Sequence, residues 1–109
     1  MPVFTTLSNS RQYREVLNTG RRARRNGIVV TCAPNERGGS RVGLVAKVGR
    51  GRAVARNRAR RRLREAVAAV GPREGYDIVI AVGPEAEGMD FQHLVRNVRE
   101  ALQEAGDGS

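Results

Sequence analysis

Arginine side chains crowd one short stretch of the sequence, RAVARNRARRRLREAV, which spans residues 52–67. Seven arginines fall within thirteen positions, from Arg52 to Arg64, and no acid lies among them. The guanidinium group stays charged and offers a planar fork of donors that matches a phosphate group. Without a partner, so many like charges repel one another and destabilise the folded chain. Bound phosphates would remove this repulsion and release condensed counterions, so the stretch predicts contact with a nucleic acid backbone.

The charges of the whole chain are also segregated, with most basic residues in its first part and most acids in its second part. Residues 1–64 carry 17 Arg or Lys and two acids, whereas residues 65–109 carry three arginines and nine acids. A solvated surface is the ordinary explanation of a charge run, but such a surface mixes both signs. Residues 37–64 contain eleven basic groups and no acid. This polarity is typical of a protein that binds a polyanion.

Helical spacing places these arginines around one amphipathic helix that ends before Gly71-Pro72. At about 100° per residue, the packing face centres on Leu63 and includes Ala59, Ala66, Val67 and Val70. The polar positions fall into three groups: Arg58, Arg61 and Glu65 opposite the core, Asn57, Arg62 and Arg64 on the flanks, and Arg56 and Arg60 at the seam with a sheet. The helix would therefore present arginines both to solvent and to any cleft beside it.

No arrangement of residues suggests hydrolysis by the protein itself. His93 is the only histidine, and it is expected on the surface of the last helix. Glu65 and Asp77 lie too far apart in the pattern to act as a pair, whereas a two-metal site needs clustered carboxylates. Residues 49–51, Gly-Arg-Gly, lack the Lys-Ser or Lys-Thr ending of a phosphate-binding loop. Cys32 is the only cysteine, so neither an internal disulfide nor a cysteine metal site is expected.

Three strands and two further helices are expected to position these residues. A first helix would begin at Ser8-Asn9-Ser10 and end at Gly20. The apolar, β-branched runs predict strands at 27–33, 41–47 and 76–82. Because a turn sequence separates the first two strands, we expect them to pair as an antiparallel hairpin. Asp90 would cap a final helix that carries one apolar stripe.

The length of 109 residues predicts a single domain over residues 1–109, with a flexible tail at 106–109. No apolar run approaches the roughly 20 residues that a membrane helix needs. The N-terminal residues also lack the charged and then apolar pattern of a secretory signal. We therefore expect a cytoplasmic protein without a membrane partner. No feature of the sequence indicates an oligomeric state.

The stretch AVARNRARRRLREA resembles, in order and spacing, the signature of the protein subunit of bacterial ribonuclease P. An Arg-Asn pair followed at fixed spacing by two basic residues and then Arg-Glu is far more specific than basic composition. The matching positions are Ala53, Val54, Arg56, Asn57, Arg58, Arg60, Arg61, Leu63, Arg64 and Glu65. Other parts of the chain that look like the family are Tyr13–Gly20, Arg41–Leu44, Asp77–Ile80 and Phe91.

This resemblance implies an α/β (α+β) two-layer sandwich with the element order αβββαβα. It implies a four-stranded sheet and a left-handed βαβ crossover through the arginine-rich helix. It also adds a short first strand near Arg22–Arg25 to the three strands predicted from the residues.

The resemblance also implies the function of an RNA-binding subunit, which assists a catalytic RNA in endonucleolytic removal of the 5′ leader from precursor tRNA. The RNA with its bound Mg²⁺ would perform the hydrolysis, so we expect no catalytic residue and no metal ligand in the protein. The residues expected to bind the ribonuclease P RNA are Arg50, Arg52, Arg56, Asn57, Arg58, Arg60, Arg61, Arg62 and Arg64. A cleft for the single-stranded leader would involve Arg11, Tyr13, Leu17, Ile28 and Thr31.

The role of Tyr13 and the class of the protein each have an alternative interpretation. Tyr13 would stack on a base of the leader, or it would only pack the first helix on the sheet. A ribosomal-type protein or assembly factor that binds structured RNA would have the same composition, and only the spaced signature argues against it. A DNA-binding module is less favoured because no helix-turn-helix pattern is present. A membrane-active helix is less favoured because the apolar face is mostly alanine and valine.

Overall fold

The computed structural model describes residues 5–7, 9–35, 38–47, 53–72, 74–86 and 88–107. The strands are β1 (Thr5–Thr6), β2 (Arg21–Arg25), β3 (Ile28–Pro34), β4 (Arg41–Ala46) and β5 (Tyr76–Val82). The helices are α1 (Ser10–Thr19), α2 (Ala53–Val70) and α3 (Phe91–Asp107), with a 3₁₀ turn η1 (Pro84–Ala86) before α3. Apart from the two-residue β1, which was not expected, the order αβββαβα and the short strand β2 are confirmed.

The strands form one mixed sheet in the order β1-β4-β5-β3-β2. Strand β5 lies between β3 and β4, antiparallel to β3 and parallel to β4. The predicted hairpin of β3 with β4 is therefore wrong, because a turn between two strands does not prevent a later strand from inserting between them. Strand β3 forms its hairpin with β2 instead, through Asn26 and Gly27, whose φ angles are 47° and 86°. A two-residue hairpin turn of type I′ requires positive φ at both central residues, and Asn-Gly is its favoured sequence.

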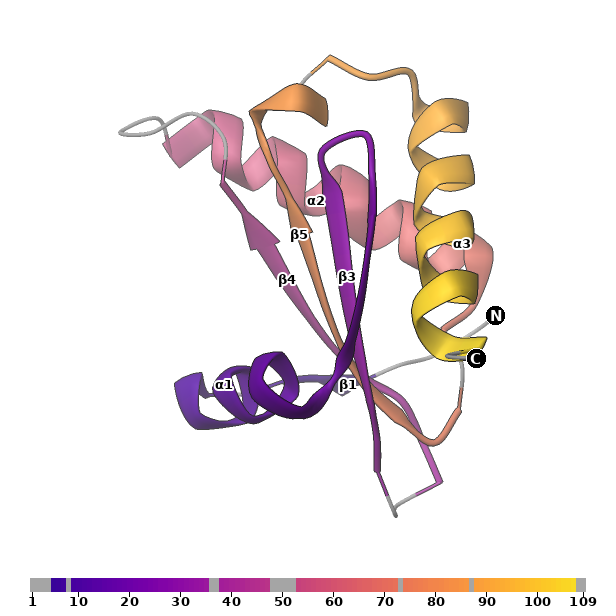
Figure 1. The fold of residues 1–109 in the computed structure, drawn as a ribbon. Coiled ribbons are helices and arrows are strands. Elements are labelled where there is room, and N and C mark those ends of the chain that lie inside the picture. The colour runs from indigo at the N-terminus through magenta and orange to yellow at the C-terminus, as the bar shows by residue number, and fades with distance from the viewer. Residues whose placement is uncertain are drawn as a thin grey trace.

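Helices cover the two faces of the sheet unequally (Figure 1). Helices α2 and α3 pack on one face and build the main core, whereas α1 alone lies on the other face. Side chains alternate between the faces along a strand. The even-numbered residues of β3 and β5 accordingly point into the main core, and their odd-numbered residues face the side of α1.

The residues that cap the helices, at their first or last turn, act as the sequence predicts. The backbone N–H of Gln12 donates to Oδ1 of Asn9 over 3.0 Å, and that of Gln92 donates to Oδ2 of Asp90 over 3.1 Å. Gly71 ends α2 with a φ of 81°, a left-handed value that glycine adopts without strain. Helix α3 continues two residues into the segment predicted as a tail. None of the helices in the described ranges is long and apolar enough to cross a membrane.

An ion pair of low exposure fixes β4 beside β5. Arg41 donates from Nε to Oδ1 of Asp77 over 2.9 Å and from Nη2 to Oδ2 over 2.5 Å. The two side chains are 14% and 12% exposed. Asn35 donates to the same Oδ1 over 2.9 Å. The hydrogen bonds to Asp77 raise the pKa of Arg41 above its ordinary value, so this guanidinium stays charged at any physiological pH.

Candidate nucleic-acid interfaces

A groove of about 320 Å³ crosses the part of the sheet that α1 leaves uncovered. We call it the sheet groove. Its floor consists of Val29, Thr31, Val79 and Ala81. Around the floor lie Leu17 of α1, the basic residues Arg22, Arg24 and Lys47, the acid Glu85, and the glycines 27 and 83. An aliphatic floor and a basic rim together suit a single strand of nucleic acid, which carries both flat bases and phosphates.

Strand β2 places two arginines on this groove because its side chains alternate between the two faces of the sheet. Ala23 is 3% exposed and belongs to the main core, so Arg22 and Arg24 project from the opposite face into the sheet groove. Arg25 shares the face of Ala23 and forms ion pairs with two glutamates of α3. Neither Arg22 nor Arg24 was among the residues predicted for the leader cleft. The pattern Arg-Ala-Arg, with one small apolar residue between charges, was the available signal.

Tyr13 is half-buried between α1 and the sheet, where it packs against a small cluster that includes Val16 and Val79. A Cβ placed on Gly43 would lie 2.5 Å from Cε2 of Tyr13, so the ring rests directly on the Gly43 backbone. The ring also borders a shallow hollow that Leu7 helps to line. The packing role of Tyr13 is thereby confirmed, and its stacking on a base stays a prediction.

The other residues predicted for the cleft divide into three cases. Leu17 is 43% exposed and lies where the shallow hollow meets the sheet groove. Thr31 lines the groove but is only 1% exposed, and Arg11 is exposed on α1 without lining the groove. The prediction for Ile28 is wrong, because its side chain is 0% exposed in the main core beneath the helices. Its odd-numbered neighbour Val29 takes the place in the groove.

Helix α2 carries its arginines on the face that the helical spacing predicts. Its buried residues are Leu63, Ala66 and Val67. The exposed polar residues are Asn57, Arg58, Arg60, Arg61, Arg64 and Glu65, and we call them the arginine face. Arg56 is half-buried, whereas Arg60, which was expected beside it at the seam with the sheet, is exposed. Arg50 and Arg52, also predicted to bind RNA, lie outside the described residues.

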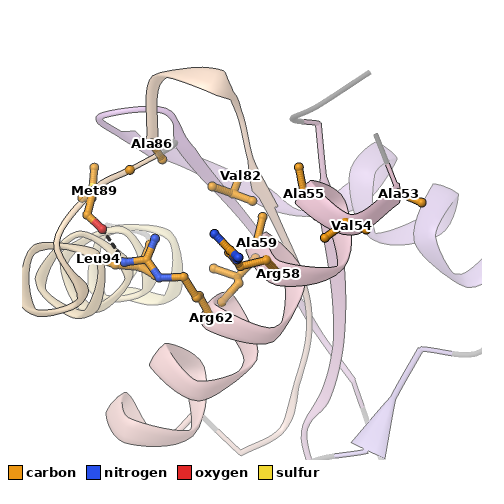
Figure 2. Close-up of a pocket in the computed structure, with 12 residues that line it drawn as sticks. Ala53, Val54, Ala55, Arg58, Ala59, Arg62, Val82, Ala86, Met89 and Leu94 are labelled. Carbon is orange, nitrogen blue, oxygen red and sulfur yellow. Dashed lines mark hydrogen bonds between the residues drawn. The ribbon is translucent and has the colours of Figure 1, made fainter. Parts of the chain in front are cut away.

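Arg62 has a contact inside the protein that the sequence did not reveal. Its Nη2 donates to the backbone carbonyl of Met89, in the segment before α3 (Figure 2). This hydrogen bond fastens α2 to that segment and uses part of the donor capacity of Arg62. Arg58, one turn earlier, projects on the same side of the helix (Figure 2).

The described side chains do not form a metal site. No group of three or more His, Cys, Asp or Glu residues that could hold a metal ion occurs among them. His93 is exposed on α3, and its backbone carbonyl accepts a hydrogen bond from Asn97 over 2.9 Å. The chemistry that these side chains offer is binding of an anionic chain through guanidinium and ammonium groups.

A basic groove on one face of an α/β sandwich and an arginine-covered helix in the opposite layer define a nucleic-acid-binding protein. A model of the Ribonuclease P family matches residues 1–106. The chain belongs to the family of ribonuclease P protein components.

Relatives and solved structures agree with this assignment. The ribonuclease P protein component of Roseiflexus sp. (strain RS-1) is 42% identical over 103 residues, covering 92% of this chain and 84% of the relative. That of Symbiobacterium thermophilum is 38% identical, covering 92% of this chain and 90% of the relative. The ribonuclease P protein of Thermotoga maritima superposes with a TM-score of 0.78 at 25% identity, covering 91% and 96% of the two chains. The Staphylococcus aureus protein matches the fold with a TM-score of 0.80 at 20% identity, covering 94% and 96%.

The function of this family is transfer RNA processing as the RNA-binding protein subunit of ribonuclease P, in which it assists the RNA subunit in removing the 5′ leader from precursor tRNA. The match therefore decides against the ribosomal-type alternative, which the composition alone left open.

Proposed function

We propose that the chain serves an endoribonuclease by holding two RNAs at once, each on its own surface. The leader of precursor tRNA would lie in the sheet groove, and the catalytic RNA would lie on the arginine face of α2. The observation that carries this proposal is the position of the two surfaces in different layers. The groove floor is made by odd-numbered strand residues that face away from α2, so neither RNA would displace the other.

The sheet groove suits a single strand without a fixed sequence. Its aliphatic floor would receive bases, and Arg22, Arg24 and Lys47 would meet the phosphates. No amide side chain, which could read a base edge, lines the groove among the described residues, and the charged side chains that line it stand on its rim. The only hydroxyl on the floor belongs to Thr31, which is 1% exposed. We therefore infer that the leader is bound by its shape and charge.

The arginine face would bind the catalytic RNA chiefly through phosphates. Arg58, Arg61 and Arg64 are exposed, and none of them forms an ion pair with another described residue. Cations at an RNA surface reduce the repulsion between its folded segments and the substrate. We infer that the chain thereby lowers the Mg²⁺ concentration at which the RNA is active. The catalytic Mg²⁺ would be held by RNA oxygens, and the complex would work in the cytoplasm.

A cleavage assay tests this division of labour. Precursor tRNA would be incubated with a bacterial ribonuclease P RNA at low Mg²⁺, with and without the protein, and a precursor whose leader is cut to one nucleotide would serve as the matched substrate. We expect the protein to restore cleavage at the mature 5′ end, more strongly for the full leader, and to cleave nothing without the RNA. Cleavage by the protein alone, or tight RNA binding without any stimulation, would contradict the proposal.

A further inference from the structure

A further cavity, larger than the sheet groove, lies in the helical layer. It has a volume of about 760 Å³ and opens between the first turns of α2, the turn η1 and the start of α3 (Figure 2). Its walls are largely aliphatic and include Ala59, Leu63, Val82, Ala86, Met89 and Leu94. Ligand pockets usually measure about 300–1,000 Å³ and combine apolar walls with a few charged groups. This helical cavity has both the size and the lining of such a site.

Two guanidinium groups stand at the opening of the helical cavity. Arg58 and Arg62 both line it, and Figure 2 shows their side chains directed across the opening toward the segment that carries Met89. Arg62 is held there by its hydrogen bond to the Met89 carbonyl. Arg58 is exposed and makes no hydrogen bond or ion pair with another described residue. The charge at the opening favours an anionic group beside an apolar one.

Hydrogen bonds hold the far wall in place before any ligand binds. The backbone N–H of Met89 donates to the carbonyl of Ala86 over 3.1 Å. Its sulfur accepts from Nδ2 of Asn97 over 3.4 Å, and Asn97 is only 7% exposed. Oδ1 of Asn97 in turn accepts from Asn26 in the β2–β3 turn over 3.0 Å. A wall held in this way loses little freedom on binding, which favours affinity.

We propose that the helical cavity receives one unstacked nucleotide of the catalytic RNA, with its base among the aliphatic side chains and its phosphate on Arg58. The inference rests on the proposed function, because it assumes that α2 faces that RNA. Arg58 belongs both to the arginine face and to the cavity opening, so an RNA lying on α2 would pass this opening. The planar guanidinium can stack on the base while it pairs with the phosphate. Val54, which is 76% exposed beside the opening, would be covered by the same RNA.

The methionine content of the chain offers a direct readout. The chain has two methionines, Met1 and Met89, so protein labelled with ¹³C at the methionine methyls gives one signal from the cavity wall. A base inserted beside Met89 would shift this signal upfield through its ring current. We expect the shift on titration with the ribonuclease P RNA and, at high concentration, with adenosine monophosphate. Inorganic phosphate would not produce it.

Two matched variants on the same helix localise the effect. Ala55→Leu adds bulk at the cavity, whereas Ala69→Leu makes the same change at an exposed position near the other end of α2. Alanine and leucine both favour helix, so neither change should disturb α2 itself. A buried or stacked base contributes about 1–3 kcal/mol, so Ala55→Leu should weaken binding of the catalytic RNA by about 5- to 150-fold and remove the Met89 shift. Ala69→Leu should change neither.

The outcomes separate this inference from the proposed function. An unmoved Met89 signal in unmodified protein saturated with the RNA would overturn the inference, while stimulation of cleavage would leave the proposed function standing. An upfield shift that Ala55→Leu does not abolish would also overturn it, because the base would then lie elsewhere. A shift with a fatty acid such as decanoate, and none with the RNA, would make an amphipathic anion the occupant instead. Failure of the protein both to bind the RNA and to stimulate cleavage would overturn both proposals.

Discussion

The ring of Tyr13 lies on the backbone of Gly43, and a Cβ at position 43 would come within 2.5 Å of Cε2 and 2.6 Å of Cζ of that ring. Helix α1 is thus placed by a contact that only glycine permits. Leu17, one turn after Tyr13, belongs to the rim of the sheet groove. The distance of α1 from the sheet therefore positions the part of the groove rim that Leu17 forms.

Replacing Gly43 with alanine should push Tyr13 and α1 away from the sheet. We expect Gly43→Ala to lower the free energy of unfolding by about 1–3 kcal/mol, as overpacked sites do, and to weaken binding of precursor tRNA relative to mature tRNA. Denaturant unfolding and a binding assay would measure the two effects. Gly39→Ala is the control, because a Cβ there meets no atom within 4 Å. Equal unfolding midpoints for the two variants would contradict the proposed contact.

The two arginines that β2 contributes to the sheet groove should matter for the leader alone. We expect Arg22→Ala and Arg24→Ala to weaken binding of precursor tRNA and to reduce its salt dependence, by about 0.7 in the log–log slope for each single-strand phosphate that is no longer neutralised. Binding of mature tRNA should change little. Arg21→Ala is the matched control, since Arg21 is exposed on the same strand but does not line the groove. A similar weakening in the control would mean that general charge, rather than the groove, binds the leader.

The arginine face should bind the catalytic RNA without stabilising the fold. We expect Arg58→Ala and Arg61→Ala to weaken binding and to reduce the salt slope by about 0.9 for each phosphate that the side chain neutralises, with no change in the melting temperature. Both residues are exposed on α2, as Arg99 is on α3, so Arg99→Ala provides a control with the same loss of charge. Unchanged salt slopes in both α2 variants would show that the RNA contacts another surface.

The ion pair between β4 and β5 should contribute strongly to stability. Asp77→Asn leaves Arg41 charged in a site of low exposure, so we expect a loss of about 3–5 kcal/mol in the free energy of unfolding. Glu104→Gln makes the same chemical change in a surface pair with Arg25, whose side chains are 36% and 51% exposed, and should cost about 0–1 kcal/mol.

The pH dependence of this loss follows from the raised pKa of Arg41. A group whose pKa is raised by folding stabilises the folded state at every pH below its pKa in the unfolded chain. For Arg41 this contribution is lost only as the pH rises above the ordinary pKa of arginine. The difference between Asp77→Asn and unmodified protein should therefore be the same at pH about 7 and about 9. A difference that falls within this range would point to another titrating group.

Local patterns predicted local structure well. The faces of α2 follow from a period of 3.6 residues, and the capping roles of Asn9 and Asp90 follow from side chains that reach only two or three residues along the chain. Strand β2 was predicted only from the resemblance to the family, because its own composition gives no strand signal. Four of its five residues are arginines, and its single apolar residue, Ala23, is too little to indicate a strand.

Long-range relationships were not accessible from the residues. Which strand lies beside β3 depends on β5, more than forty residues later, and the turn after β3 carries no information about it. The wrong assignment of Ile28 shows how sharply a strand position matters, since a shift of one residue moves a side chain to the other face. The hydrogen bond of Arg62 to Met89 likewise joins segments that only the folded sheet brings together.

The central position of β5 also determines when the molecule can assemble during synthesis. The hairpin of β2 and β3 needs only neighbouring residues, so it can form as soon as those residues emerge from the ribosome. Strand β4, in contrast, pairs with the two-residue β1 and with β5, which ends at Val82. A nascent chain that stops before β5 therefore has two unconnected halves of a sheet, and α2 has no complete surface to pack on. Premature termination anywhere before that strand would remove the whole domain rather than shorten it.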